Sequence, residues 1–466
     1  MIASLGFDAY RDRVASALER DWHFGGLHAA SQGEVVRTLL VDADGATRLI
    51  EVTAERGSAP SIVDLAPAAG WDEREAADLY GLGFVDHRPL RPLVRHTEET
   101  GSWTVPVSGG DAYEVAVGPI HAGVIESGHF RFHVVGDRIL HVDTRLFYKH
   151  RGLEKAAEGK TLDAGMPYVT RACAACAVTN GVAYAHACEE ALGLEPTAEL
   201  ARARTVLLEL ERTWSHLNDI AAVCAGVGLA AGNNLFAALT ERARRLNERL
   251  TGHRFLFGSV QIGSSVLAID GDRVRAARDE LAELRRQARR GWRELSFNSS
   301  FRDRLPDISV VTAADVERLG AVGPAARAAG VAADVRATSP RLAYDDFRPV
   351  VADRAEGDVQ ARLEQRALEL WQTFDQLEAL LDRPVRPGTA ERGTGETPIG
   401  IGRVESPRGA TSCVVERDGD TIERLHLRTG SYANWPAVAH AAADDLLPDF
   451  PLINKSFELC YACADR

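Results

Sequence analysis

Two Cys-x-x-Cys pairs, Cys173 with Cys176 and Cys460 with Cys463, are the residues whose types and spacing are best suited to chemistry. One turn of backbone separates the two sulfurs of each pair, so both can bind the same metal. Nearly 300 residues separate the pairs, far more than the roughly 15–20 residues between the pairs of a zinc ribbon. The pairs are therefore either the four thiolates of one long-range site or a coincidence of spacing.

The setting of the pairs narrows the choice. A thioredoxin-like redox pair needs a βαβ context, which the helical surroundings of Cys173 do not supply. Four thiolates that join the ends of a large helical domain favour a soft or borderline catalytic metal, such as nickel or iron. The other three cysteines, Cys188, Cys224 and Cys413, are isolated, and we expect them to be buried apolar thiols.

Composition describes an ordinary globular protein of 466 residues with a mean hydropathy of −0.16. The net charge of −13 argues against nucleic acid as the main partner and against docking on anionic lipid through a basic patch. The N-terminus lacks the features of a signal peptide. The longest apolar run, 221–232, is about twelve residues, whereas a membrane-spanning helix needs roughly 18–20. We therefore expect a cytoplasmic chain that does not itself cross a membrane.

Local patterns predict a small α/β unit at residues 1–100, followed at 84–111 by a linker rich in proline, arginine, threonine and glycine. The predicted elements of this unit are a helix at 11–19, a β-hairpin of strands 35–41 and 47–53 with its turn at 42–45, and a short amphipathic helix at 71–81 that ends in Gly81.

The remainder is predicted to be mainly helical with small sheets. Three long helices follow from apolar residues at helical spacing, at 197–225, 274–288 and 363–381. Strands are predicted at 113–117, 130–135, 139–142, 413–416 and 421–427, and the run 315–338 is expected to be irregular. The loop 118–129 carries His121, Glu126 and His129, and a glycine-punctuated loop with such side chains is typical of a functional site.

The surroundings of the cysteines are similar to those of a known family. Arg171-x-Cys-x-x-Cys near the start of a helical domain, with Cys-x-x-Cys close to the C-terminus, resembles the large subunit of nickel–iron hydrogenases. Further matches indicate the respiratory-complex-like (group 4) branch, of the formate hydrogenlyase large-subunit type, which is related to the 49-kDa subunit of NADH:quinone oxidoreductase (complex I). These matches are Gly118–His121, Glu126–Phe130, Arg145–Lys155, Glu209–Leu217, Gly323–Gly330, Glu405–Gly409 and Tyr432–Pro436. The segment 71–81 resembles the signature of the 30-kDa subunit of complex I, which this branch often carries at its N-terminus.

The resemblance implies an α+β protein with two domains. Residues 1–100 would form a small α/β domain like the 30-kDa subunit. Residues 112–466 would form a large, mainly helical domain like the hydrogenase large subunit or the 49-kDa subunit, with a small antiparallel sheet.

The resemblance also implies a nickel–iron centre whose iron carries diatomic ligands. Its ligands would be the four thiolates, with Cys176 and Cys463 bridging both metals and Cys173 and Cys460 terminal on nickel. Arg408, after Pro407, would lie over the open face of the nickel as a fixed positive charge. Glu126 would begin the proton path. Without the resemblance, Arg408 is a turn arginine on a Pro-Arg-Gly corner and Glu126 forms a loop salt bridge.

Five further residues are implied to surround the ligands: Arg171, Asn180, His129, Pro407 and Glu458. Some depart from the family pattern, since Ala174 replaces a glycine, Asn180 replaces a histidine, and Glu458-Leu459 replaces Asp-Pro. Asparagine cannot carry a proton near pH 7. Altered surroundings of intact ligands ordinarily change affinity or activity. We expect these changes to affect hydrogen turnover more than metal binding.

The implied function is that of the catalytic large subunit of a membrane-associated nickel–iron hydrogenase complex, which interconverts H2 with protons and electrons. No iron–sulfur ligands remain once the four thiolates are assigned, so electrons would pass to a partner iron–sulfur subunit. The other implied partners are membrane subunits of a complex-I-like assembly and formate dehydrogenase, carbon monoxide dehydrogenase or a ferredoxin-like electron carrier. The chain would be peripheral on the cytoplasmic face of the cell membrane.

Two other classes stay open. One is a complex-I-like NADH:quinone or ferredoxin oxidoreductase subunit, without nickel, whose cavity binds a quinone. The other is a non-catalytic scaffold that keeps a structural four-thiolate metal such as zinc. The end of the sequence at Arg466 looks like the processed end of a hydrogenase large subunit, or like a chain that never had an extension.

Overall fold

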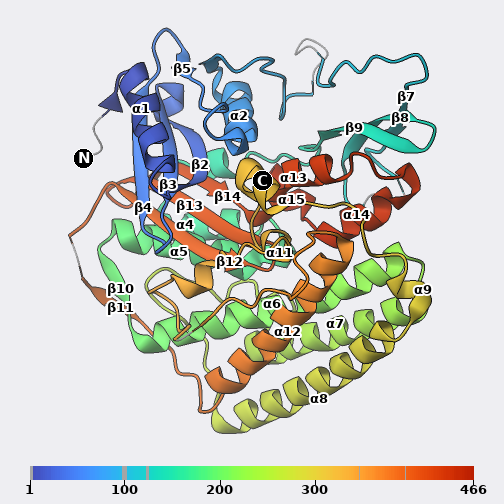
Figure 1. The fold of residues 1–466 in the computed structure, drawn as a ribbon. Coiled ribbons are helices and arrows are strands. Elements are labelled where there is room, and N and C mark those ends of the chain that lie inside the picture. The colour runs from blue at the N-terminus through green and yellow to red at the C-terminus, as the bar shows by residue number, and fades with distance from the viewer. Residues whose placement is uncertain (1–3, 97–101, 122–124, 346, 394) are drawn as a thin grey trace.

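The computed structural model describes residues 4–96, 102–121, 125–345, 347–393 and 395–466. The predicted α+β fold is confirmed within these ranges. Figure 1 shows a blue N-terminal unit at the upper left, a bundle of long helices below, and an orange-red sheet between them. No helix in the described ranges is both long enough and apolar enough to cross a membrane.

The N-terminal unit is a four-stranded sheet with two helices. Its elements are β1 (Ser4–Leu5), α1 (Phe7–Leu18), β2 (His23–Ala30), β3 (Val35–Val41), β4 (Thr47–Thr53), β5 (Ser58–Pro60), α2 (Gly70–Tyr80) and β6 (Gly83–Val85). The sheet order is β1-β4-β3-β2. The predicted hairpin is confirmed, and the Asp42 carboxylate closes its turn by accepting the Asp44 N–H at 3.1 Å and the Ala46 N–H at 2.8 Å. As predicted, α2 ends at Gly81, whose φ of 70° favours glycine.

A second small sheet lies on the other side of the linker region. It consists of β7 (Tyr113–Val117), β8 (His129–Val135) and β9 (Arg138–Arg145), paired antiparallel in chain order. These three strands agree with the prediction. Since β8 begins at His129, the loop that carries Glu126 leads directly into this sheet.

Long helices enclose the largest apolar core. The helices of this part are α3 (Leu153–Ala157), α4 (Leu162–Thr170), α5 (Ala177–Ala191), α6 (Ala198–Gly226), α7 (Ala230–Thr251), α8 (Gly271–Ser296), α9 (Ser299–Arg302), α10 (Ala313–Leu319), α11 (Pro324–Ala328) and α12 (Val359–Leu380). The three predicted long helices are α6, α8 and α12, which begin at the side-chain caps Thr197, Asp270 and Asp358.

The expectation of irregular structure at 315–338 is wrong in part, because α10 and α11 occupy much of this run. Thr312 and Asp315 form a reciprocal capping box that starts α10, and Pro324 starts α11. Helices of five to seven residues are too short to show a clear apolar stripe, so these capping residues are the sequence features that mark them.

A three-stranded sheet and three helices complete the chain. They are β12 (Ile399–Ser406), β13 (Gly409–Asp418), β14 (Thr421–Arg428), α13 (Gly430–Ala441), α14 (Phe450–Phe457) and α15 (Tyr461–Asp465), while β10 (Leu194–Pro196) pairs separately with β11 (Ala390–Arg392). The predicted strands at 413–416 and 421–427 lie within β13 and β14.

The unpredicted strand β12 has a tertiary cause. It packs so closely on α5 that a Cβ at Gly400 would lie 1.9 Å from the Ala187 carbonyl oxygen, and one at Gly402 would lie 1.8 Å from that of Ala183. Two glycines lower the strand propensity of the segment, yet they permit this contact. The contact fixes α5 against the sheet whose β12–β13 turn carries Arg408.

Candidate metal centre

The four predicted ligands come together at one point of the fold. The sulfurs of Cys173, Cys176, Cys460 and Cys463 all lie within 4.8 Å of one another, and the Cys176 and Cys460 sulfurs are 4.0 Å apart. All four side chains are buried. Four thiolates around one ion at about 2.3 Å would lie roughly 3.8 Å apart, so the arrangement fits a shared thiolate-bound metal.

The electrostatics of the sulfurs also fit a bound cation. The pKa of the Cys176 thiol and that of the Cys463 thiol are both raised, first by their hydrogen bonds to Cys173, because crowded sulfurs disfavour several negative charges. A thiolate-bound metal ion would remove this penalty, since metal ligation deprotonates thiols.

The first cysteine pair lies at the start of α5. Cys173 caps a short 3-10 turn, η4 (Ala174–Cys176), and its sulfur accepts the Ala175 N–H at 3.3 Å. Cys176 is the N-cap of α5, where the helix dipole favours a thiolate. Ala174, which replaces the family's glycine, is exposed, and the apolar residues that pack against the cysteine cluster are Ala175 and Ala462 instead.

The second pair flanks the first turn of α15. Cys460 is its N-cap, and the Cys460 N–H donates to the Ser431 hydroxyl at 3.0 Å. The Thr429 hydroxyl donates to the Cys463 carbonyl oxygen at 3.1 Å. Asp465 fixes the far end of α15, because its carboxylate accepts the Phe147 N–H at 2.7 Å and the Lys149 N–H at 2.9 Å.

Arg408 lies beside this cysteine cluster in a buried turn. Its guanidinium donates to the Glu458 carbonyl oxygen at 3.0 Å, to Asp219 Oδ1 at 3.2 Å and to the Ser215 hydroxyl. Burial lowers the pKa of Arg408, but the negative charges of Cys460, Asp219 and Cys176 outweigh this effect and raise it overall. The preceding residue, Pro407, is also buried. Arg408 is therefore a fixed cation with its three donor nitrogens held in place.

Asp219 is a site residue that sequence reasoning missed. Its buried carboxylate interacts with Arg408 and Arg366, each at 3.2 Å, and with His216 Nδ1 at 3.3 Å. The sequence could have indicated Asp219, because it follows His216 by three residues and so lies on the same side of the predicted helix. The pairing with Arg408 joins residues 189 positions apart, and no local pattern indicates it.

Glu458 lies two residues before Cys460, whose charge acts on its carboxyl group. The Asn218 amide donates to its carboxylate at 3.2 Å. Burial, followed by the neighbouring charge of Asp219, raises the pKa of Glu458 to about 8. A carboxyl group in this environment holds a proton near neutral pH.

Glu126 contacts the second cysteine pair through the backbone. Its Oε2 accepts the N–H of Ala462, the residue between Cys460 and Cys463, at 2.8 Å. Burial raises the pKa of Glu126, and the charge of Cys460 raises it further. His129 is less closely involved, because its ring packs edge-on against Trp103 at 5.2 Å, and burial lowers its pKa.

The remaining two predicted residues have other contacts. The Asn180 amide is buried in α5 and donates to the Val169 carbonyl oxygen at 3.4 Å, toward α4. Arg171 is exposed, and its guanidinium lies over the Phe257 ring at 5.3 Å. Cys188, Cys224 and Cys413 are buried, as predicted, and do not join the cluster.

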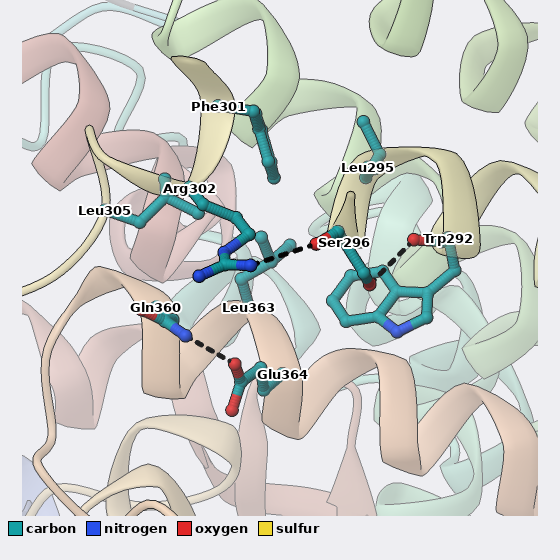
Figure 2. Close-up of a pocket in the computed structure, with 9 residues that line it drawn as sticks. All are labelled: Trp292, Leu295, Ser296, Phe301, Arg302, Leu305, Gln360, Leu363 and Glu364. Atoms are coloured by element: carbon teal, nitrogen blue, oxygen red, sulfur yellow. Dashed lines mark hydrogen bonds between the residues drawn. The ribbon is translucent and has the colours of Figure 1, made fainter. Parts of the chain in front are cut away.

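A separate cavity of about 240 Å³ lies between α8, α9 and α12 (Figure 2). Its polar side chains already bond to one another or to the backbone, as in the Gln360–Glu364 contact at 2.7 Å and the Ser296–Trp292 contact at 2.9 Å. It shares no lining residue with the cysteine cluster.

Comparison with known families covers both parts of the chain. The profile of the respiratory-chain NADH dehydrogenase 30-kDa subunit matches residues 5–106. The profile of the 49-kDa subunit matches residues 227–393 and 389–466.

Individual relatives include hydrogenase subunits. Formate hydrogenlyase subunit 5 of Escherichia coli (strain K12) is 30% identical over 448 residues, which cover 90% of this chain and 78% of that protein. Hydrogenase-4 component G of the same organism is 32% identical over 443 residues, covering 89% and 77%. A chain of the membrane-bound sulfane sulfur reductase, an archaeal respiratory membrane complex, is 28% identical with a TM-score of 0.71, covering 78% of this chain and all (100%) of that chain. The chain therefore belongs to the family of complex I 49-kDa subunits and hydrogenase large subunits, in the form that carries a 30-kDa-type domain at its N-terminus.

Proposed function

We propose that this chain is the catalytic large subunit of a membrane-associated nickel–iron hydrogenase complex that interconverts H2 with protons and electrons. The observation that carries the proposal is the convergence of four buried cysteine sulfurs within 4.8 Å beside the fixed guanidinium of Arg408. Four thiolates can also bind other metals, such as zinc. The similarity to formate hydrogenlyase subunit 5 and hydrogenase-4 component G favours a nickel–iron centre.

Cys173, Cys176, Cys460 and Cys463 would hold the nickel–iron centre. When bound, the centre supplies the redox chemistry that interconverts H2 with two protons and two electrons. Arg408 provides a preorganised positive charge in a buried site, where such a charge acts more strongly than in water.

Glu126 would exchange protons with the site. Its Oε2 is held by the Ala462 N–H, which leaves Oε1 to carry the proton. Glu458, two residues before Cys460, is a second carboxyl with a raised pKa, but its carboxylate bonds to Asn218 within the protein. We therefore assign the first proton transfer to Glu126.

Electrons would leave through an iron–sulfur partner. Beyond the four cysteines, the described residues contain one other group of potential metal ligands, Glu75, Glu154 and His426, and it holds no sulfur. The chain would attach to the cytoplasmic face of the membrane through partner subunits of a complex-I-like assembly.

Metal analysis of the complex, purified with its natural partners, tests the proposal. We expect about one nickel per chain and H2-dependent reduction of a viologen dye. Cys176→Ser should abolish both while circular dichroism shows a folded chain, because a domain of this size does not need the metal as a staple. Zinc in place of nickel, together with unfolding of the Cys176→Ser variant, would support the structural scaffold instead.

A second candidate is a related reductase of sulfane sulfur. The similarity to a chain of the membrane-bound sulfane sulfur reductase favours it, as does the departure of Asn180 and Leu459 from the hydrogenase pattern. The same purified complex separates the two functions. A complex that reduces polysulfide but neither consumes nor produces H2 would support the second candidate.

A further inference from the structure

Arg466, three residues after Cys463, lies buried between the two parts of the chain. Its guanidinium donates to the Leu427 carbonyl oxygen at 2.6 Å and to Glu154 Oε1 at 2.9 Å, and it pairs closely with Glu75. It also lies over the Tyr432 ring at 4.7 Å. Among these partners, Glu75 alone comes from the N-terminal unit, where it belongs to α2. In Figure 1 the C-terminus lies beside α15 and below α2, in agreement with the contact between Arg466 and Glu75.

The same helix makes a second buried ion pair across this seam, which we define as the contact of α2 and β2 with β14 and α15. Asp72 pairs with Arg428 of β14 at 2.9 Å, and Arg424 of the same strand donates to the Ala29 carbonyl oxygen of β2 at 2.9 Å. These charged contacts are buried, so they define one relative position of the two parts far better than apolar contact would. The N-terminal unit is thus docked directly on the elements that flank the cysteine cluster.

The helix α15 needs such outside support. It has five residues, too few to be stable alone, yet it begins at one predicted ligand and contains another. Asp465 and Arg466 hold its far end, and Asp465 bonds only to the 147–150 segment of the large domain. Arg466 is therefore the residue through which the N-terminal unit can influence the position of Cys460 and Cys463.

We infer that Glu75 is a positioning residue for the metal centre, which it supports by holding the Arg466 guanidinium at the end of α15. This inference rests on the proposed binding of a metal by the four cysteines. It gives the N-terminal domain a part in completing the metal site, in addition to any role in assembly.

Neighbouring charges indicate that Glu75 cannot simply be replaced by Glu154. Glu154 is shared with Arg424 at 3.4 Å and with His426 at 3.7 Å. Without Glu75, Arg466 would keep its bond to the Leu427 carbonyl oxygen, but this shared carboxylate would be its one remaining acidic partner among the described residues. A cavity of about 470 Å³ borders Glu75, Glu154 and Arg466, so a loosened side chain has space to move and water has space to enter.

The geometry also argues against a second metal ion at this place. Ligand atoms of Glu75, Glu154 and His426 lie within 4.8 Å of one another, as a cation site requires. The Arg466 guanidinium already lies against both carboxylates and supplies the positive charge. We therefore assign the group to support of α15.

The test compares Glu75→Gln with Glu73→Gln in the complex purified with its partners. Glu73 lies on the same helix and is also buried, but its bonds to Ser61, Ile62 and His87 stay inside the N-terminal unit. The readout is the rate at which bound metal passes to an excess of chelator. We expect Glu75→Gln to release metal about 10- to 100-fold faster, the usual effect of losing a group that supports a metal ligand. Glu73→Gln should release it at the wild-type rate.

A double-mutant cycle with Arg466→Gln tests whether Glu75 affects metal release through Arg466. If Glu75 acts through Arg466, adding Glu75→Gln to Arg466→Gln causes no further acceleration. Equal release from wild type and Glu75→Gln, or equal acceleration by Glu73→Gln, would overturn the inference. If Glu75→Gln does not assemble, Glu75→Asp replaces it, and a wild-type release rate in that variant overturns the inference as well. A wild-type complex without metal would instead refute the proposed function itself.

Discussion

Replacing Arg408 with lysine would keep a positive charge beside the cysteine cluster but remove its planar, three-nitrogen fork. In the structure the fork donates to three acceptors: Asp219 Oδ1 at 3.2 Å and the Ser215 hydroxyl, both on α6, and the Glu458 carbonyl oxygen at the end of α14, at 3.0 Å. A single ammonium nitrogen cannot reach all three positions at once. The charge would remain, while its direction toward the site would be lost.

The size of the effect follows from these contacts. Asp219 retains Arg366 at 3.2 Å and His216 at 3.3 Å, and the thiolates are unchanged, so we expect folding and metal content to survive. Loss of one preorganised donor from a dry site costs about 2.7–4 kcal/mol, so turnover should fall about 100- to 1000-fold.

The assay is H2-dependent reduction of a viologen dye, expressed per nickel atom in the purified complex. Arg366→Lys is the matched control, because Arg366 is another buried guanidinium on Asp219 and also donates to the Phe457 carbonyl oxygen at 2.6 Å. We expect this control to lower stability and leave turnover per nickel close to wild type. If Arg408→Lys keeps wild-type turnover per nickel, the assigned role of the fixed guanidinium is wrong.

Three further predictions follow from other contacts. Glu126→Gln should lower H2 turnover about 100- to 10,000-fold without loss of nickel, because it removes a proton-transfer group; equal turnover would contradict the role. Gly402→Ala should lower the unfolding temperature and the nickel content, because the new methyl would lie 1.8 Å from the Ala183 carbonyl oxygen, whereas Gly70→Ala, with nothing near its Cβ and a φ of −59°, should change little. Burial lowers the pKa of His28 and lowers that of His426 to about 3, so both rings are neutral in the folded seam. Unfolded histidine takes up its proton near pH 6.5, so stability should decline below that pH, and His426 alone should contribute about 2 kcal/mol of this loss at pH 5. Thermal unfolding at several pH values checks this, and His426→Phe should flatten the profile.

Much of the fold could be predicted from local pattern. The hairpin of β3 and β4 has alternating strands and an aspartate turn, and α6, α8 and α12 have long apolar stripes. Such signals are contained within one element. Strand β12 could not be predicted, because its Gly400 and Gly402 serve a contact with α5, more than 200 residues earlier in the chain.

In the candidate site, too, local features could be predicted from the sequence and contacts between distant segments could not. The cysteines were identifiable as pairs, since each pair lies within one turn of backbone. Their convergence followed only from resemblance and long-range spacing. Asp219 and Ser215 act on Arg408 because α6 passes beneath the β12–β13 turn, and Glu75 meets Arg466 across 391 positions. Contacts of this range depend on packing, which periodicity and propensity do not describe.

The 284 positions between Cys176 and Cys460 also define an interval in time. At about 5–20 residues per second, the ribosome makes the second pair roughly 15 to 60 seconds after the first. During that interval Cys173 and Cys176 are two thiols without the rest of their donor set, open to oxidation and to the wrong metal. A complete set of sulfurs exists only after α15 has been synthesised and has docked. A factor that delivers the proposed metal to all four sulfurs can therefore act only after α15 has been made, and the site must stay open until that helix docks.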